Sequence, residues 1–214
     1  KTKRARKPAA KPPARDPART RIALLSAAFD EMHRSGFRGA DMESILENVG
    51  VTKGALYYHF DSKEALGYAV VDEVIADITR EKWLAPLEEA RNPIDVLIGI
   101  IRTSSMTPHE TFLGCPLNNI AQEMSPLDEG FRKRTAKIFT AWQKAIATAL
   151  REGKSHGTVS KEIDPDDTAT FLIAAFEGYM SLAKNAQDAS FLRSGQKALV
   201  SYLESLRPRR GRLT

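Results

Sequence analysis

Residues 50–66, which read GVTKGALYYHFDSKEAL, gather the side chains of this sequence that are best suited to bind an anion. Lys53, Tyr57, Tyr58 and His59 fall within little more than two turns of a predicted helix. A helix that short buries little of itself, so we expect its aromatic and basic groups to face a partner. Phenol, imidazole and ammonium groups all donate hydrogen bonds to phosphate oxygens, which makes a nucleic-acid backbone the partner that fits best.

A pair of short helices, expected at 41–48 and 52–59, would position these groups. Asp41 and Thr52 are good N-cap residues, because their side-chain oxygens accept hydrogen bonds from free N–H groups of the first turn. Gly50 lies between the helices and can take the positive φ of a tight turn. This arrangement describes a helix-turn-helix, whose second helix enters the major groove of DNA. Small helix pairs also occur in all-α proteins that bind no DNA, so geometry alone leaves both interpretations open.

The rest of the chain is predicted to be helical as well, because no stretch shows sustained alternation with β-branched enrichment. Three dipeptides, at 92–93, 125–126 and 164–165, place a capping residue before a proline at the first helical position. Asp61 with Glu64 resembles a capping box. The predicted helices run from 17 to a stop at 35–36, over 41–48 and 52–59, from about 62 to 83, and over 93–105, 110–124, 126–152, 165–186 and 190–206.

Charge divides the chain into four parts. Residues 1–16 carry seven basic groups, one acid and no bulky apolar side chain, so we expect a disordered basic tail. Residues 17–63, the helix-turn-helix domain, carry six groups of each sign, whereas 64–206 carry 15 basic and 20 acidic groups. Residues 207–214 add four arginines as a second basic tail. The net charge of +5 therefore belongs to the tails, and basic charge alone is weak evidence for DNA binding here.

Several functional classes find no support in the sequence. The longest strongly apolar run, 96–101, is far too short to span a bilayer, and no signal-peptide pattern opens the chain. Cys115 is the single cysteine, which excludes an internal disulfide and any cysteine-based zinc site. No Gly-rich phosphate loop, nucleophile elbow or metal-ligand spacing occurs, so we expect neither an enzyme nor a bound cofactor or metal.

Residues 19–66 resemble the DNA-binding domain of the TetR family, the tetracycline-repressor-like bacterial regulators. The matching positions are Ala27, Ala28 and Phe29, the turn at 35–37, Ile45, the run GVTKGALYYHF at 50–60, and Lys63, Glu64 and Leu66. The resemblance implies an all-α protein with an N-terminal three-helix domain, which contains the helix-turn-helix, and a C-terminal helical domain over 64–206. It also implies a two-fold dimer that sets one recognition helix in each of two successive major grooves of double-stranded DNA.

The family pattern assigns roles by position within the third helix. Its start faces base edges, and its end faces phosphates. The candidates for base contact are Thr52, Lys53 and Ala55, with Gly54 allowing close approach of the backbone. The candidates for phosphate contact are Tyr57, Tyr58, His59 and Lys63. Arg19 and Arg21, on the first helix, are better placed than the basic tail to touch DNA in a fixed geometry. The sequence departs from the family pattern at Leu46, where alanine is common, and at Asp41, whose carboxylate repels phosphate.

In this family the C-terminal helices hold a pocket for a small-molecule effector, and the last two helices form a dimeric four-helix bundle. The resemblance therefore implies a homodimer through 165–186 and 190–206. Its expected faces are Phe171, Ala174, Ala175 and Gly178, and then Leu199, Tyr202, Leu203 and Leu206. An apolar cavity with a few polar groups is what small-ligand recognition needs. The candidate pocket residues are Met106, His109, Phe112, Cys115, Asn118, Phe139, Trp142, Phe176 and Tyr179.

The predicted function is a ligand-released repressor that binds a palindromic operator as a dimer in the bacterial cytoplasm. Two alternatives stay open. Cys115 would sense electrophiles or oxidants if a nearby helix start lowered its pKa and made it a thiolate. Alternatively, the basic tails would bind DNA without sequence preference, as in an architectural protein.

Overall fold

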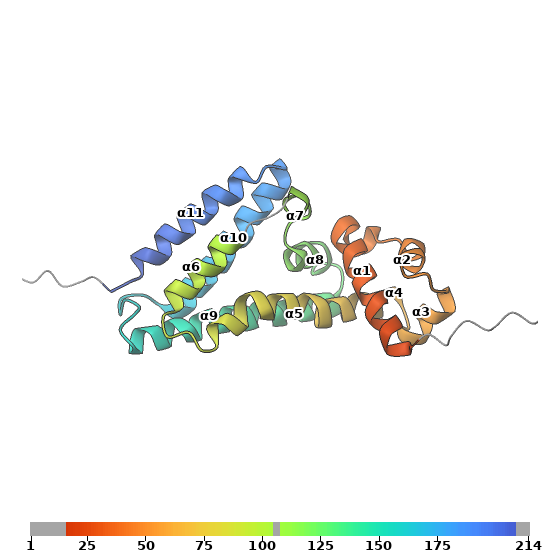
Figure 1. Cartoon of the computed structure of the whole chain (residues 1–214), viewed down its shortest axis with the longest axis horizontal. Helices are drawn as coiled ribbons and strands as arrows, with labels where there is room; N and C mark the ends of the chain where they lie inside the picture. The colour runs from red at the N-terminus through yellow and green to blue at the C-terminus, as the bar shows by residue number, and fades with distance from the viewer. Residues whose placement is uncertain (1–15, 105–107, 209–214) are drawn as a thin grey trace, which may run out of the picture.

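The computed structural model describes residues 16–104 and 108–208, and every regular element in these two ranges is a helix (Figure 1). The predicted all-α class is confirmed. The tails predicted at 1–16 and 207–214 lie almost wholly outside the described residues, and so does Met106. None of the described helices is long and apolar enough to cross a membrane.

Three helices form the N-terminal bundle: α1 (Pro17–Gly39), α2 (Met42–Val49) and α3 (Lys53–His59). Asp16 caps α1, because its side chain accepts a hydrogen bond from the N–H of Ala18 at 3.0 Å. Gly36 interrupts α1 with a φ of 76°, which lies in the region that favours glycine. The helix stop predicted at 35–36 is therefore confirmed as a break in α1.

The turn between α2 and α3 is built as the sequence indicates. The side chain of Asp41 accepts from the N–H of Glu43 at 3.0 Å and starts α2. Gly50 ends α2 in the left-handed region, with a φ of 68°. The hydroxyl oxygen of Thr52 then accepts from the N–H of Ala55 at 3.3 Å and starts α3. Both predicted caps are confirmed, and they fix the angle at which α3 leaves the turn.

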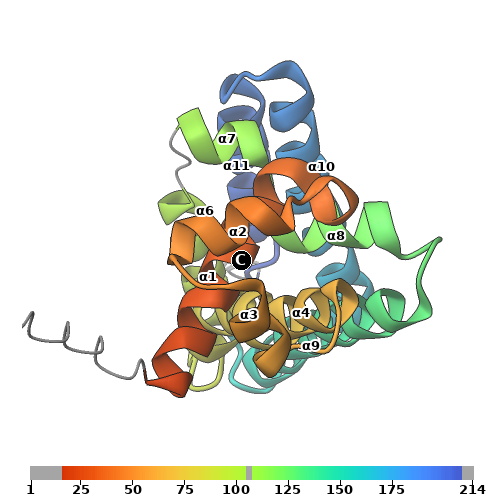
Figure 2. The same ribbon diagram turned by 90° about the vertical axis from the view of Figure 1, so that its right-hand side faces the viewer.

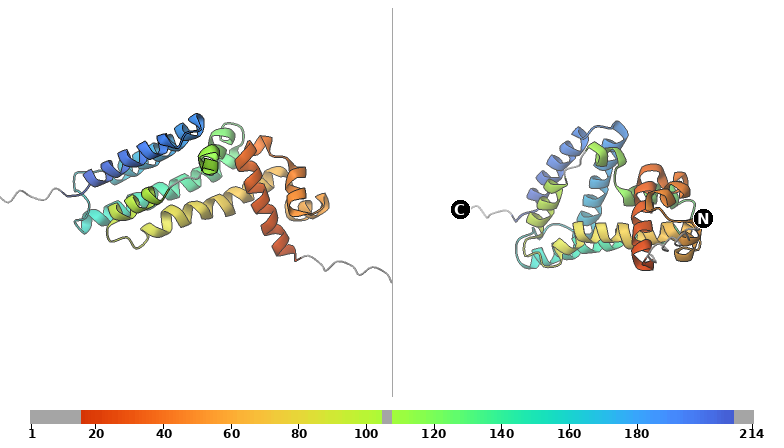
Figure 3. Two further views of the ribbon diagram at one scale, coloured as in Figure 1. Left: turned by 45° about the horizontal axis from the view of Figure 1, so that its top comes forward. Right: turned by 45° about the vertical axis from the view of Figure 1, so that its right-hand side comes forward.

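One long helix connects this bundle to the body and runs beside α9 (Figure 3). It consists of α4 (Lys63–Ala69), η1 (Val70–Ile75), α5 (Ala76–Thr79) and η2 (Arg80–Leu84), with a 3-10 turn, η3 (Ala85–Leu87), at its end. The turns η1 and η2 are π-helical. The capping box predicted at Asp61 is wrong, because Ser62 occupies the cap and its hydroxyl accepts from the N–H of Ala65 at 3.1 Å.

The body comprises α6 (Pro93–Thr103), α7 (Pro108–Leu113), α8 (Pro116–Met124), α9 (Glu129–Ser155), α10 (Pro165–Ala186) and α11 (Ser190–Ser205). The single helix predicted over 110–124 is wrong. Pro116 has no N–H and keeps Cys115 in extended backbone, which separates α7 from α8. The start predicted at Ser125-Pro126 is also wrong, because 125–127 form a turn and Asp128 caps α9.

Two hydrophobic cores hold these elements together. The first contains Leu24, Ile45 and Leu66 of the N-terminal helices, and also Leu117 of α8 and Phe131 of α9. The second lies among η2, α6, α9, α10 and α11. Because α8 and α9 contribute to the first core, the body packs directly against the helix-turn-helix domain. The domain boundary at 63/64 falls at the start of α4 and stays a prediction.

Candidate nucleic-acid interface and effector pocket

The exposed side of α3 is the candidate nucleic-acid interface, and α3 lies at the end of the molecule that faces the viewer in Figure 2. Leu56 and Phe60 are buried and anchor the inner side of the helix. On the outer side, Tyr58 is 77% exposed and Tyr57 is 46% exposed. The ammonium of Lys53 lies 5.9 Å from the centre of the Tyr57 ring. Phenol and ammonium groups are thus presented together on a surface that no described residue covers.

A hollow of about 400 Å³ lies between this surface and the start of α1. Thr20 of α1 lines one side, and Thr52, Ala55, Tyr58 and His59 line the other. The ring of His59 is half-buried and meets the Tyr58 ring edge-on at 5.0 Å between centres. The predicted residues Thr52, Ala55, Tyr58 and His59 are therefore brought together, and Lys53 and Gly54 are exposed beside them.

Arg21 is placed differently from the sequence expectation. Its guanidinium makes two hydrogen bonds to the carboxylate of Glu73, at 2.7 and 2.5 Å, and lies over the Phe60 ring at 5.2 Å. This pairing lowers the pKa of Glu73 and raises that of Arg21, and it ties α1 to η1. Of the two arginines proposed for DNA, only Arg19 has an exposed side chain without such a partner in the described chain.

Lys63 also works within the protein. Its ammonium donates to the carbonyl oxygens of Ala40 at 2.7 Å and Arg38 at 3.2 Å, and it lies 5.3 Å from the centre of the Phe37 ring. A cation at the end of a helix stabilises the free carbonyls there. Lys63 therefore closes the end of α1 and fixes the start of α4 against it.

Glu123 on α8 was missed by sequence reasoning, yet it holds the end of α1, after the break at Gly36 and just before the helix-turn-helix. Its two carboxylate oxygens accept from the backbone N–H groups of Phe37 at 2.8 Å and Arg38 at 2.9 Å. A Cβ on Gly36 would lie 2.8 Å from this carboxylate. Because glycine has no Cβ, the carboxylate of Glu123 can approach the backbone of α1 this closely. The partners are 85 residues apart or more, and no local pattern signals such a contact.

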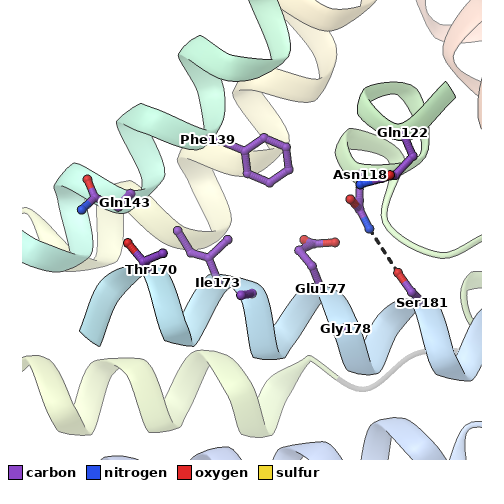
Figure 4. A pocket seen from close by; sticks show the side chains of 10 residues that line it. Asn118, Gln122, Phe139, Gln143, Thr170, Ile173, Glu177, Gly178 and Ser181 are labelled. Carbon is purple, nitrogen blue, oxygen red and sulfur yellow. Dashed lines mark hydrogen bonds between the residues drawn. The ribbon is translucent and has the colours of Figure 1, made fainter. Parts of the chain in front are cut away.

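A pocket of about 480 Å³ opens between α8, α9 and α10 (Figure 4). It is lined by Asn118, Gln122, Phe139, Gln143, Thr170, Ile173, Ala174, Glu177, Gly178 and Ser181. Two predicted residues, Asn118 and Phe139, line it. Glu177, Gln122 and Gln143 were not predicted, because polar residues on amphipathic helices ordinarily face solvent and the sequence does not show which of them face inward.

The other predicted pocket residues lie elsewhere. Trp142 and Phe176 are buried in an aromatic cluster with Trp83, and Tyr179 packs over Gly195 of α11. Phe112 is 57% exposed. Met106 and the side chain of His109 lie outside what the structure describes. Trp142 and Phe176 were predicted to line the pocket from residue type alone, and they pack in the hydrophobic core instead.

Glu177 is the unusual group of the pocket. It is 7% exposed, and neither carboxylate oxygen has a hydrogen-bond partner of good geometry in the described chain. Burial raises the pKa of Glu177 to about 7, and the nearby Cys115 thiol and Lys82 ammonium act against this rise. A buried carboxyl without a partner lowers the stability of the folded protein, so a ligand that pairs with Glu177 would restore that stability.

A reactive cysteine has a lowered pKa, whereas the environment of Cys115 raises the pKa of its thiol. Burial raises its pKa well above the usual thiol value, and the charge of Glu177 adds to the rise. The N–H groups of Asn118 and Leu117 at the start of α8 lower the pKa, as the sequence suggested, but their effect is smaller than that of burial. No group of three or more metal-ligating side chains occurs in the described part of the chain.

Comparisons with known proteins agree with this geometry. The family model described as "Bacterial regulatory proteins, tetR family" matches residues 24–70, and "Tetracyclin repressor-like, C-terminal domain" matches residues 99–199. The chain is 31% identical over 180 residues to the HTH-type transcriptional repressor DhaR of Mycobacterium sp. (strain GP1), covering 80% of this chain and 87% of that protein. It is 28% identical over 169 residues to the transcriptional regulator AcuR of Cereibacter sphaeroides, covering 76% and 75% of the two chains.

Solved structures show the same architecture. A TetR transcriptional regulator from Chloroflexus aurantiacus J-10-FL superimposes with a TM-score of 0.77 at 28% identity, over 88% of this chain and 96% of that one. The regulatory protein TetR from Rhodobacter sphaeroides gives 0.75 at 25% identity, over 86% and 98%. Fold and site together define a helix-turn-helix regulator of transcription. The chain belongs to the TetR family.

Proposed function

We propose that this protein is a repressor that binds a palindromic operator as a homodimer in the bacterial cytoplasm and leaves it when a small effector enters the pocket. The position of α8 carries the proposal. Asn118 and Gln122 of α8 line the pocket, and Glu123 of the same helix holds the end of α1 that follows the break at Gly36. One rigid element therefore contacts both the effector site and the DNA-binding domain.

For the DNA contact, we assign Thr52, Lys53 and Ala55 to base edges and Tyr57, Tyr58 and His59 to phosphates. The exposure of Tyr57 and Tyr58 and the hollow beside His59 support this assignment. Phosphate contacts position the helix and base contacts select the sequence. Arg21 and Lys63 serve this interface indirectly, by holding α1 and α4 in place beneath α3.

For the dimer, we assign the outer surface of α10 and α11. Phe171 and Leu182 on α10, and Phe191 on α11, are large apolar side chains that remain 42–49% exposed. Phe171 meets the Tyr202 ring edge-on at 4.7 Å, which joins the two helices into one apolar face. Exposed apolar area of this kind marks interaction sites, and two-fold dimers are the commonest assembly. Leu199, Leu203 and Leu206, which the sequence offered to the partner, are buried within the chain instead.

For release, effector binding is linked to operator binding through two arrangements of α8. An effector that seats against Asn118 and Gln122 favours the arrangement that suits the pocket, and Glu123 moves with the same helix. DNA favours the arrangement in which the two α3 helices match successive major grooves. A ligand shifts such an equilibrium only by its differential affinity for the two states.

An architectural DNA-binding role through the basic tails is the competing function. Removing residues 1–15, which leaves the Asp16 cap intact, separates the two. We expect the truncated protein to protect the same operator in a footprint. The slope of its affinity against salt should be shallower by roughly 0.9 for each phosphate that the tail neutralises in the full-length protein. Loss of all protection on truncation would favour the architectural role.

A redox regulator through Cys115 is the second competing function. The raised pKa of the thiol disfavours attack by a thiolate. We therefore expect Cys115→Ser to respond to its effector as the wild type does. A Cys115→Ser protein that electrophiles no longer release from operator, while they release the wild type, would instead establish the sensor.

A further inference from the structure

The pocket presents one carboxylate that lacks a partner. Glu177 projects from α10 toward the space between Phe139 on α9 and Asn118 on α8 (Figure 4). Both of its carboxylate oxygens are buried, and neither has a hydrogen-bond partner among the residues that the structure describes. A buried charge without a counterpart destabilises a protein, and a ligand that brings the opposite charge removes that cost.

The remaining polar groups of the pocket are neutral. Asn118, Gln122 and Gln143 offer amides, and Thr170 and Ser181 offer hydroxyls. Among the described residues that line it, none is a lysine, an arginine or a histidine. Within the described lining, an anionic ligand would be repelled by Glu177 and would find no basic side chain to offset the repulsion. A cationic ligand would be attracted to Glu177, the one charged residue of that lining.

Two titratable groups act on Glu177 from the elements packed against it. Lys82 on η2 lies with its ammonium 5.6 Å from the centre of the Phe176 ring, and it is absent from the lining of the pocket. Cys115, at the junction before α8, stays a neutral thiol because burial raises its pKa. Neither of them gives Glu177 a hydrogen bond of good geometry.

The rest of the lining suits an apolar body of modest size. Phe139 and Ile173 form apolar walls, and Ala174 and Gly178 leave room along α10. A volume of about 480 Å³ falls within the range of small-ligand pockets. The Phe139 ring also offers a π-face, which attracts a cation at short range.

We propose that this pocket binds a small organic cation, an amine with an aromatic or aliphatic body, whose nitrogen pairs with Glu177. The inference rests on the proposed function, because it names the chemical class of the effector. In this proposal, Glu177 pairs with the charge of the ligand, and Phe139 and Ile173 contact its apolar body. The amides of Asn118 and Gln122 on α8 link ligand binding to the DNA-binding domain.

The affinity of the pocket for a ligand should depend on pH, and the direction of this dependence distinguishes a cationic ligand from a neutral one. A cation pairs with the ionised form of Glu177, so its affinity falls as the pH is lowered through about 7, toward tenfold for each unit below it. A ligand that accepts a hydrogen bond from the protonated carboxyl would bind more tightly as the pH falls.

The test uses three probes that share a phenylethyl-type body and differ in charge: phenethylammonium, 2-phenylethanol and phenylacetate. Calorimetric titration of the full-length protein should show the ammonium ion binding at least tenfold more tightly than the alcohol at pH 8, and phenylacetate most weakly. Glu177→Gln should remove this preference and the pH dependence. Asp167→Asn, which neutralises an exposed acid on the same helix outside the pocket, should change neither.

Three results would overturn the proposal: no binding of the ammonium ion at millimolar concentration, equal affinity for ammonium and alcohol, or a preference that survives in Glu177→Gln. The proposed function is tested separately, by operator release. Ammonium binding that depends on Glu177 but leaves operator binding unchanged would keep the cation site and contradict ligand-released repression. A protein that protects no operator would contradict repression, whatever the titrations show.

Discussion

At the scale of single residues, three carboxylates of the described chain differ in whether the protein supplies them with a hydrogen-bond partner. Glu73 and Glu123 are carboxylates with partners, an arginine in one case and two backbone N–H groups in the other. Glu177 has no such partner in the described chain, and it lines a pocket. Identical chemical groups therefore have different roles, and the local environment decides which role each one has.

Glu177 makes the stability of the unliganded protein depend on pH. Its pKa rises to about 7 on folding, so the folded state binds the proton more tightly than the unfolded state does. Stability is then fully present below the unfolded pKa and is lost as the pH rises toward 7, by an amount on the order of 3 kcal/mol. Thermal unfolding between pH 5 and pH 8 measures the effect.

The Glu177→Gln protein should lose this component of the pH dependence and be more stable than wild type at pH 8. Asp167→Asn should keep the wild-type profile. Identical pH profiles for wild type and Glu177→Gln would contradict the burial argument.

Tyr58 allows the interface to be tested without disturbing the fold. Its side chain is mostly exposed, so Tyr58→Phe should leave the unfolding temperature nearly unchanged. Loss of one hydroxyl donor to phosphate should weaken operator binding about fivefold, with the sequence preference intact. Tyr179→Phe, which alters a half-buried ring between α10 and α11, is the control. Equal operator affinities for wild type and Tyr58→Phe would remove Tyr58 from the interface.

At the scale of elements, α8 is the decisive helix, and the sequence did not indicate its role. The helices around the motif were predictable, because the caps Asp41 and Thr52 and the turn at Gly50 are local signals. The contact of Glu123 with residues 37 and 38 joins parts of the chain that are far apart in the sequence. The residues around position 123 therefore do not predict it. The same holds for Arg21, whose basic character suggested DNA although its partner Glu73 lies 52 residues away.

The pocket was predictable only in outline for a related reason. An apolar cavity was expected, and aromatic residues were chosen for it, but Trp142 and Phe176 pack against Trp83 in the core. Which face of a long helix borders a cavity depends on how α8, α9 and α10 are set against one another. That arrangement is determined by packing over the whole body rather than by any local spacing.

Glu123→Gln tests the role of α8. The amide has one accepting oxygen where the carboxylate has two, so it cannot accept from both Phe37 and Arg38 in the same way. We expect a folded protein whose operator affinity, measured well below its unfolding temperature, falls about tenfold or more, since charge-assisted hydrogen bonds contribute about 1.5–3 kcal/mol each and 1.4 kcal/mol is about tenfold. Glu129→Gln, an exposed acid at the start of α9, should leave it unchanged. Wild-type operator affinity in Glu123→Gln would show that α8 does not control the domain.

At the scale of the whole molecule, α3 lies at one end and the paired helices α10 and α11 lie toward the other, with α8 between them (Figure 1). The long helix from α4 to η2 and the parallel run of α9 span that distance (Figure 3). A small displacement of the body helices in each protomer would therefore alter the separation of the two α3 helices in a dimer. Separation is what a palindromic operator with a fixed half-site spacing detects.

The dimer face is tested by placing a charge on it. Phe171→Glu puts a carboxylate into the exposed apolar surface of α10, where a like charge from the partner would oppose it. We expect a folded monomer in sedimentation equilibrium, with operator binding reduced by a hundredfold or more. Ile78→Glu, at an exposed apolar position on α5, should stay dimeric. A dimeric Phe171→Glu protein would exclude this face.

The central claim is that two α3 helices of a dimer read a two-fold symmetric operator. A footprint of the purified full-length protein on the DNA that flanks its own gene tests it most directly. We predict a protected palindrome whose half-site centres lie one helical turn apart, about 10 base pairs, or a multiple of it, on one face of the duplex, with two protomers bound. No sequence-specific protection, or protection of a single site without symmetry, would contradict the claim.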